Sequence, residues 1–397
     1  MDPFDRLPWF VVQSILSNIP DLPSLHRLHN ASPAVTTFLH RNNDLFAQIV
    51  DALIGNPARE RGLLAVRLIV LIWSRDSDSK RMKESYTDIL SILQYVREFS
   101  PRSQHRSPPI ERTISRSTPS AILCRLLSLM TRLRCIAHEC FHSMIARCLE
   151  LRVEHLPKKT KYINTREVVD RSRRPQGTLY VPFDIGPPTW MEEQRLLHGL
   201  LCIILFIELR KPHVECSVTT EDGDSIQTIL DDDMEGLWKK ILWKYNDGQV
   251  EQISTLLQWL DEQASSRGNV HSWIYSRVLP EAYSYCCGNL TSMTDQQWGA
   301  AEADLGRGRS TRGALCLWRC QAQNGSPLRC VNYSAFRPYG LVFWDCIRMD
   351  TLGLPGAHPS RRMWFAWSSI LAEEDWETIL ELQPVTPTVD EMGGYEI

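Results

Sequence analysis

The stretch that decides the fold is residues 2–40, DPFDRLPWFVVQSILSNIPDLPSLHRLHNASPAVTTFLH. It predicts three short helices, because each one has its own start signal. Pro8 suits the first position of a helix, where its missing N–H would be unpaired anyway. Asp21 and Ser32 are good N-cap residues, and a proline follows each of them within two positions. Isolated helices shorter than roughly 12–15 residues are marginal in water, so these three need a packing partner.

Apolar residues recur at helical spacing in each of the three segments, which gives every helix one apolar face. They are Val11, Val12, Ile15, Leu16 and Ile19, then Leu22, Leu25 and Leu28, then Val35, Phe38 and Leu39. Pro20 ends the first helix, and Pro23 and Pro33 lie in the first turns of the second and third.

These residues resemble the F-box, in the variant common in fungal F-box-like proteins. The resemblance implies a docking device whose helices pack on the Skp adaptor, which joins them to a cullin scaffold in SCF-type ubiquitin ligases. It implies that the following positions face the adaptor or lie between the helices: Leu7, Pro8, Val11, Ile15, Leu16, Ile19, Leu22 and Leu25. The chain differs from the family pattern at Phe10, where an acidic residue is usual, and at residues 31–35, which lack a Cys-x-x-Trp pattern.

A second match lies far along the chain. Residues 337–348, RPYGLVFWDCIR, are similar to an Arg-x-x-Gly-x-Val-Phe-Trp-Asp run that recurs late in fungal F-box-like proteins. The run belongs to an aromatic-rich part at 290–383. Such aromatic density is most often core, and a partner-binding pocket is the less frequent interpretation.

The composition is that of a soluble intracellular protein. Apolar residues make up 43% of the chain and charged residues 23%, and the net charge of −3 predicts no whole-chain attraction to nucleic acid. Twelve cysteines without a signal peptide predict reduced thiols in the cytoplasm or nucleus. The apolar run at 196–207 is too short to span a membrane, which takes about 20 residues, so we expect no membrane segment.

Helical periodicity predicts a mainly α fold with three parts. These are the N-terminal three-helix segment at 1–42, a large irregular helical body with long loops at 43–383, and a disordered tail at 384–397. Within the body, helices are expected at 43–54, 58–73, 80–99, 118–149, from 189 onward and at 234–260. The basic stretch at 100–117 predicts an exposed loop, and residues 178–188 predict an extended connection. A second basic stretch at 157–177 could contact nucleic acid, but Tyr162 is its only aromatic residue and stacking would need more.

The closest group of potential metal ligands is Cys135, His138, Cys140, His142 and Cys148. On one continuous helix Cys140 points about 140° away from Cys135, so a single tetrahedral zinc ion cannot reach all five. We interpret them as packing residues of a buried helix. No phosphate-binding loop, His-Glu-x-x-His pair or Gly-x-Ser-x-Gly turn is present. We therefore expect no catalytic residue, no cofactor and no metal.

The main hypothesis is a non-catalytic substrate receptor that presents an unknown protein to a cullin ligase through the Skp adaptor. An alternative is a helical interaction or scaffold protein whose N-terminal helices only cap its own body. Burial of Val11, Ile15, Leu16 and Leu25 by the chain itself would favour this alternative, whereas an exposed apolar stripe implies a missing partner. A third idea is a zinc-stabilised nucleic-acid binder that uses the Cys135–Cys148 group and the basic stretch at 157–177.

Overall fold

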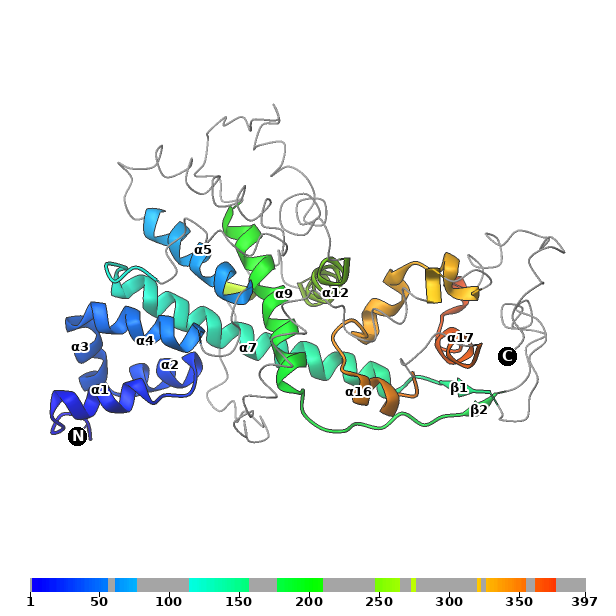
Figure 1. The fold of residues 1–397 in the computed structure, drawn as a ribbon, viewed down its shortest axis with the longest axis horizontal. Helices are drawn as coiled ribbons and strands as arrows, with labels where there is room; N and C mark the ends of the chain where they lie inside the picture. Colours follow the sequence, from blue (N-terminus) through cyan, green and yellow to red (C-terminus); the bar gives the residue numbers. More distant parts are fainter. Residues whose placement is uncertain are drawn as a thin grey trace, which may run out of the picture. The chain divides into compact units, whose positions relative to one another are not determined.

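A computed structural model describes residues 2–55, 61–76, 114–156, 177–209, 247–264, 273–275, 320–322, 326–354 and 361–375. Most of these residues are helical, which confirms the mainly α prediction (Figure 1). The chain forms two compact units, one of residues 1–142 and 187–309 and the other of residues 143–186 and 310–397. The predictions for 80–99, the tail at 384–397 and nearly all of the two basic stretches fall outside the described residues.

The first unit begins with four helices: α1 (Trp9–Ser17), α2 (Leu22–Ala31), α3 (Pro33–Arg41) and α4 (Asn43–Gly55). The predicted start signals are present. Asp21 Oδ1 accepts the Ser24 N–H at 2.8 Å, and Ser32 Oγ accepts the Val35 N–H at 3.1 Å. Pro8 is the N-cap of α1 rather than its first helical residue. Helices α2, α3 and α4 pack against one another, so the predicted three-helix segment exists and continues into a fourth helix.

Further helices in the described part of the first unit are α5 (Arg61–Asp76), most of α7 (Ser120–Leu149), α9 (Trp190–Leu209) and α12 (Asp247–Ala264). Helix α9 packs on α5 and on α12 (Figure 1). Its apolar run is buried, as expected for a core helix. A Cβ atom at Gly199 would lie 2.5 Å from Leu256 Cδ1, so the glycine permits the close approach of α9 to α12. None of the helices in the described parts of the chain combines the length and apolar content of a membrane span.

The second unit has a core of aromatic residues. Its described elements are the last turns of α7, the antiparallel strands β1 (Glu154–His155) and β2 (Thr178–Leu179), the 3₁₀ helices η2 (Pro327–Cys330) and η3 (Tyr333–Tyr339), and the helices α16 (Cys346–Thr351) and α17 (Arg361–Ser368). Five aromatic side chains are fully buried, namely Phe336, Phe343, Trp344, Phe365 and Trp367. The prediction that the aromatic-rich part forms core is thus confirmed for the residues described.

The RPYGLVFWDCIR run of the second unit contains a glycine that no other residue could replace without strain. Gly340 has φ +62°, in the left-handed region, and it ends η3. A Cβ atom there would lie 2.5 Å from Met144 Sδ and 2.8 Å from the Trp344 ring. Trp344 in turn donates its indole N–H to the Tyr339 carbonyl at 2.8 Å. The run therefore contributes packing and a tight turn to this unit.

Candidate functional site

An exposed apolar face lies at the start of the N-terminal segment. Trp9 is 66% exposed and Phe10 58%, and Leu7 and Ile15 are each 37% exposed. Val11 is half-buried and lies one turn before Ile15 on the same side of α1. The rings of Trp9 and Phe10 meet edge to face with their centroids 6.0 Å apart. Leu7 precedes the helix, and Trp9, Phe10 and Val11 point about 100° apart around it, so these residues surround the buried side of α1 rather than forming one line. We use the name apolar face of α1 for the five residues together.

A narrow stripe of α1 belongs to the core of the first unit. Val12 and Leu16 are buried, and they follow Val11 and Ile15 directly in the sequence, so the helix turns one apolar stripe inward and leaves its neighbour outside. Because α1 has only nine residues, it depends on the inward stripe for its stability. The outward stripe is available to another surface.

The structure divides the eight residues that were predicted to face an adaptor or lie between helices. Leu7, Pro8 and Ile15 are exposed, and Val11 and Ile19 are half-buried. Leu16, Leu22 and Leu25 are buried among the chain's own helices, which is the interhelical position.

Sequence analysis did not select Trp9 and Phe10 as binding residues. Neighbouring helical residues point about 100° apart, so two adjacent aromatic residues in a first turn cannot share one narrow core stripe. That spacing was the signal that could have identified them.

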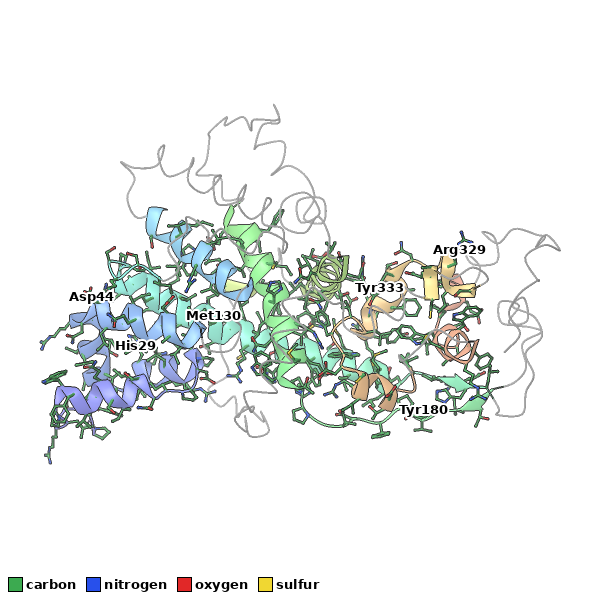
Figure 2. The ribbon with its side chains drawn as sticks, in the orientation of Figure 1. His29, Asp44, Met130, Tyr180, Arg329 and Tyr333 are labelled. Atoms are coloured by element: carbon green, nitrogen blue, oxygen red, sulfur yellow. The ribbon has the colours of Figure 1, made fainter. Side chains whose placement is uncertain are left out.

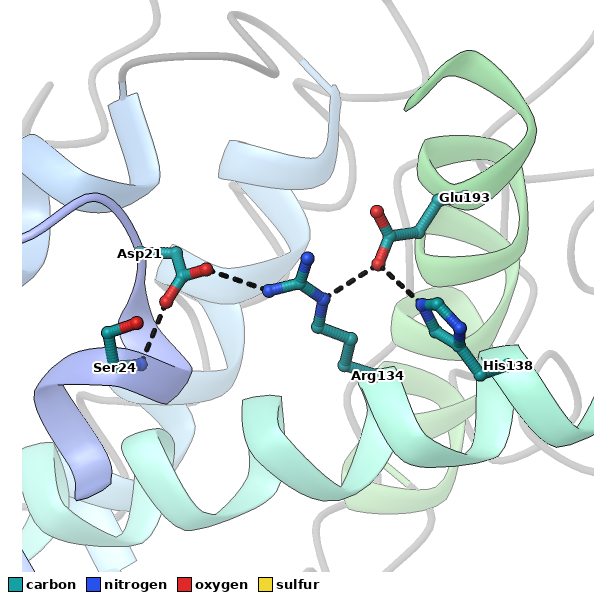
Figure 3. Close-up of polar contacts among 5 residues, drawn as sticks. All are labelled: Asp21, Ser24, Arg134, His138 and Glu193. Atoms are coloured by element: carbon teal, nitrogen blue, oxygen red, sulfur yellow. Dashed lines mark hydrogen bonds and ion pairs between the residues drawn. The ribbon is translucent and has the colours of Figure 1, made fainter. Parts of the chain in front are cut away.

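A buried ion-pair network ties the N-terminal segment to the helices behind it (Figure 3). Arg134 of α7 donates through Nη1 to Asp21 Oδ2 at 2.8 Å and through Nε to Glu193 Oε1 at 2.7 Å. Glu193 Oε1 also lies 3.1 Å from His138 Nε2. Asp21 is the N-cap of α2, and Glu193 lies in the first turn of α9. One arginine therefore joins α2, α7 and α9.

The network keeps its carboxylates charged. Burial by itself raises the pKa of Glu193, but the hydrogen bond from His138 and the positive charges of Arg134 and His138 outweigh burial and lower that pKa below its usual value. Burial likewise raises the pKa of Asp21, and its hydrogen bonds with Ser24 and the nearby Arg134 reverse that effect and lower the pKa. At neutral pH the Arg134 guanidinium thus has two charged carboxylate partners. The N-terminal segment, which includes the apolar face of α1, is therefore attached to α7 and α9 by ion pairs.

A second exposed apolar stripe lies in the other unit, in the extended stretch that begins with β2. Its members alternate along the chain and are Leu179, Val181, Phe183 and Ile185. Side chains two residues apart in an extended segment share a face. Between them, Pro182 is buried, and the Tyr180 hydroxyl donates to the Thr351 carbonyl at 3.1 Å. Residues 178–179 are a strand and residues 180–188 contain no helix, which agrees with the predicted connection at 178–188.

The group of potential ligands on α7 does not form a ligand cluster in the described structure. Cys135, His138, Cys140 and Cys148 are buried, whereas His142 is exposed. His138 faces Glu193, and the Cys148 thiol donates to the Tyr339 carbonyl at 3.1 Å. Burial raises the pKa of Cys148 to about 12, so its thiol stays protonated and unreactive. The interpretation as packing residues is confirmed for the four buried members.

Comparison of the chain with protein-family models, curated proteins and solved structures finds no match in any of the three. Function is therefore inferred from the exposed face, from its anchoring network and from the sequence resemblance.

Proposed function

We propose that the chain is a non-catalytic substrate receptor of an SCF-type cullin ubiquitin ligase, which docks through its N-terminal segment on the Skp adaptor. The observation that carries the proposal is the apolar face of α1, where Trp9 and Phe10 stay largely exposed and Leu7 and Ile15 are each 37% exposed, whereas Val12 and Leu16 of the same helix are buried. Contiguous exposed apolar residues mark interaction surfaces. Burying what is exposed of each ring yields on the order of 1–3 kcal/mol, enough for two such rings to anchor a complex.

The proposal gives the predicted adaptor-binding residues two different roles. Leu7, Pro8, Val11 and Ile15 contact the adaptor together with the two aromatic rings, because they are the accessible members of the set. Leu16, Leu22 and Leu25 act indirectly by holding α1 and α2 in place. Ubiquitin transfer belongs to the partner proteins, and this chain contributes burial and orientation.

A helical scaffold protein whose N-terminal helices only cap its own body is the second candidate. It is favoured by the complete burial of Leu16 and Leu25 and by the Arg134 network, which attach the segment to the first unit. It does not explain why Trp9 and Phe10 are exposed. The two candidates differ in whether the apolar face of α1 binds another protein.

Co-purification of the full-length chain with a purified Skp adaptor tests the proposal. The variant Trp9→Ser/Phe10→Ser/Ile15→Ser alters only side chains that are already exposed, so it should fold like the wild type. Truncating a central contact residue costs about 2 kcal/mol or more, or roughly 30-fold in affinity, so the triple variant should fail to retain the adaptor.

The matched control is Val181→Ser, which removes an exposed apolar side chain from the other unit. It should co-purify with the adaptor like the wild type. A well-folded wild type that retains no adaptor, or a triple variant that retains as much as the wild type, would contradict the proposal and favour the scaffold candidate.

A further inference from the structure

Three potential metal ligands converge from three helices of the first unit. His29 lies in the last turns of α2, His40 in the last turn of α3 and Cys124 in the first turns of α7 (His29 is labelled in Figure 2). The two Nε2 atoms are 3.4 Å apart, and Cys124 Sγ lies 3.4 Å from Nε2 of His29 and 3.6 Å from Nε2 of His40. The imidazole centroids are 5.6 Å apart, so both Nε2 atoms point into the gap between the rings.

These separations are the edges of a zinc coordination tetrahedron. With Zn–N bonds of about 2.0–2.1 Å and a Zn–S bond of about 2.3 Å, tetrahedral angles place two nitrogens about 3.3–3.4 Å apart and a sulfur about 3.5–3.6 Å from each nitrogen. The nitrogen–nitrogen distance of 3.4 Å and the sulfur–nitrogen distance of 3.6 Å match these values, and the other sulfur–nitrogen distance, 3.4 Å, is only slightly shorter. Hydrogen bonds between the thiol and the two imidazoles can also hold these three groups together, and a bound ion would replace all three contacts with bonds to one centre.

A chain of hydrogen bonds orients His29 for this role. Thr131 Oγ1 donates to the Leu127 carbonyl at 2.8 Å, so it accepts at 3.1 Å from Nδ1–H of His26. His26 Nε2 then accepts from the Asn30 amide at 3.1 Å. Finally, Asn30 Oδ1 accepts from His29 Nδ1–H at 3.1 Å, which leaves the His29 Nε2 lone pair facing the gap.

A histidine that ligates a metal through one nitrogen usually donates its other N–H to an oxygen that fixes the ring. Asn30 supplies that oxygen for His29.

We propose that His29, His40 and Cys124 bind a zinc ion. A mixed nitrogen and sulfur ligand set suits zinc, whereas magnesium and calcium require oxygen ligands. His40 is exposed and the other two residues are half-buried, so the ion can enter from solvent. Three protein ligands leave the fourth tetrahedral position open to water or to a further ligand.

The ion would have a structural consequence that is independent of any docking partner. His29 and His40 belong to the N-terminal segment, whereas Cys124 belongs to α7. Zinc would therefore clamp the segment to the helix behind it, on the same helix that carries the Arg134 network. Because an ion that binds only the folded state stabilises it by mass action, zinc should raise the melting temperature of the full-length chain.

The test is a titration of the purified full-length chain with Zn²⁺, and with Co²⁺ as a spectroscopic probe of thiolate coordination. Wild type should bind zinc with roughly 100-fold higher affinity than Cys124→Ser or His40→Gln, and the cobalt–thiolate absorption of this site should be absent from both of these variants. His40 is exposed, so His40→Gln keeps the fold even if Cys124→Ser does not. The matched control Cys346→Ser removes a half-buried thiol of the second unit and should bind like the wild type.

The melting temperature gives an independent readout. Zinc should raise it in the wild type and in Cys346→Ser, and the rise should be absent in His40→Gln. Zinc binding and thermal stabilisation that remain unchanged in His40→Gln and Cys124→Ser, or a wild type that binds no zinc, would overturn the proposal.

Discussion

Replacing Arg134 by methionine removes a cation that joins α2, α7 and α9, while it keeps an apolar stem in the same space. The variant removes the guanidinium partner of Glu193. The Glu193 side chain is only 7% exposed, so water cannot replace that partner. Breaking a buried ion pair by removing one partner costs about 3–5 kcal/mol. Asp21 is 28% exposed and can recover water, so its lost pair adds little to that cost. We expect Arg134→Met to lower the free energy of unfolding by about 3–5 kcal/mol.

The assay is thermal unfolding followed by circular dichroism at neutral pH. Each kcal/mol shifts the melting temperature of a domain of 150–250 residues by about 2–4 °C, and the first unit is only slightly larger than that, so the expected loss is roughly 6–20 °C. Arg41→Met is the matched control, because this arginine is exposed on α3. Surface substitutions of this kind change stability by about 0.5 kcal/mol or less.

A second substitution separates the ion pair from simple packing. In Arg134→Met/Glu193→Gln the buried charge is gone, and the glutamine oxygen can still accept a hydrogen bond from His138. We therefore expect the double variant to be about 0.5–3 kcal/mol more stable than Arg134→Met alone. An Arg134→Met loss below about 1 kcal/mol, or a double variant no more stable than the single one, would refute the reasoning.

Two further predictions follow from the glycines and from the titration of Glu193. Gly340→Ala should lower the free energy of unfolding by about 2–4 kcal/mol, because the cost of a left-handed backbone at alanine adds to the cost of overpacking by the new Cβ. Gly186→Ala, with φ +101° but no atom within 4 Å of the new Cβ, should cost less, and equal losses would contradict the packing argument. The folded-state pKa of Glu193 lies below its ordinary 4.5, so its contribution to stability is present above pH 4.5 and is lost as the pH falls through the folded-state value. The melting temperature of wild type should thus fall more steeply between pH 5 and pH 3 than that of Glu193→Gln, and parallel curves would contradict this attribution.

The local start signals were readable from the sequence because capping involves residues three positions apart. Asp21 and Ser32 cap α2 and α3 as predicted. Helix ends are less certain: α5 was expected at 58–73 and lies at Arg61–Asp76, and Pro8 precedes α1 by one position. These shifts are small because the apolar period fixes where a helix lies more firmly than where it ends.

The long-range contacts were not readable from the sequence. Arg134 and Glu193 are 59 residues apart, and Cys124 lies 95 residues from His29 and 84 from His40. Apolar periodicity tells which face of a helix is buried, but not which helix covers it. The search for metal ligands therefore considered neighbours within one helix, at Cys135–Cys148, and passed over a group that only the packing of α2, α3 and α7 brings together.

The most direct test of the proposed function is the affinity of the full-length chain for a purified Skp adaptor, measured by isothermal titration calorimetry at several temperatures. We expect binding with a negative heat-capacity change, the signature of buried apolar surface. We also expect a loss of at least about 30-fold in affinity for Trp9→Ser/Phe10→Ser/Ile15→Ser, and none for Val181→Ser. Absence of binding by a folded wild type, or equal affinity of the triple variant, would contradict the claim that the apolar face of α1 docks on the adaptor.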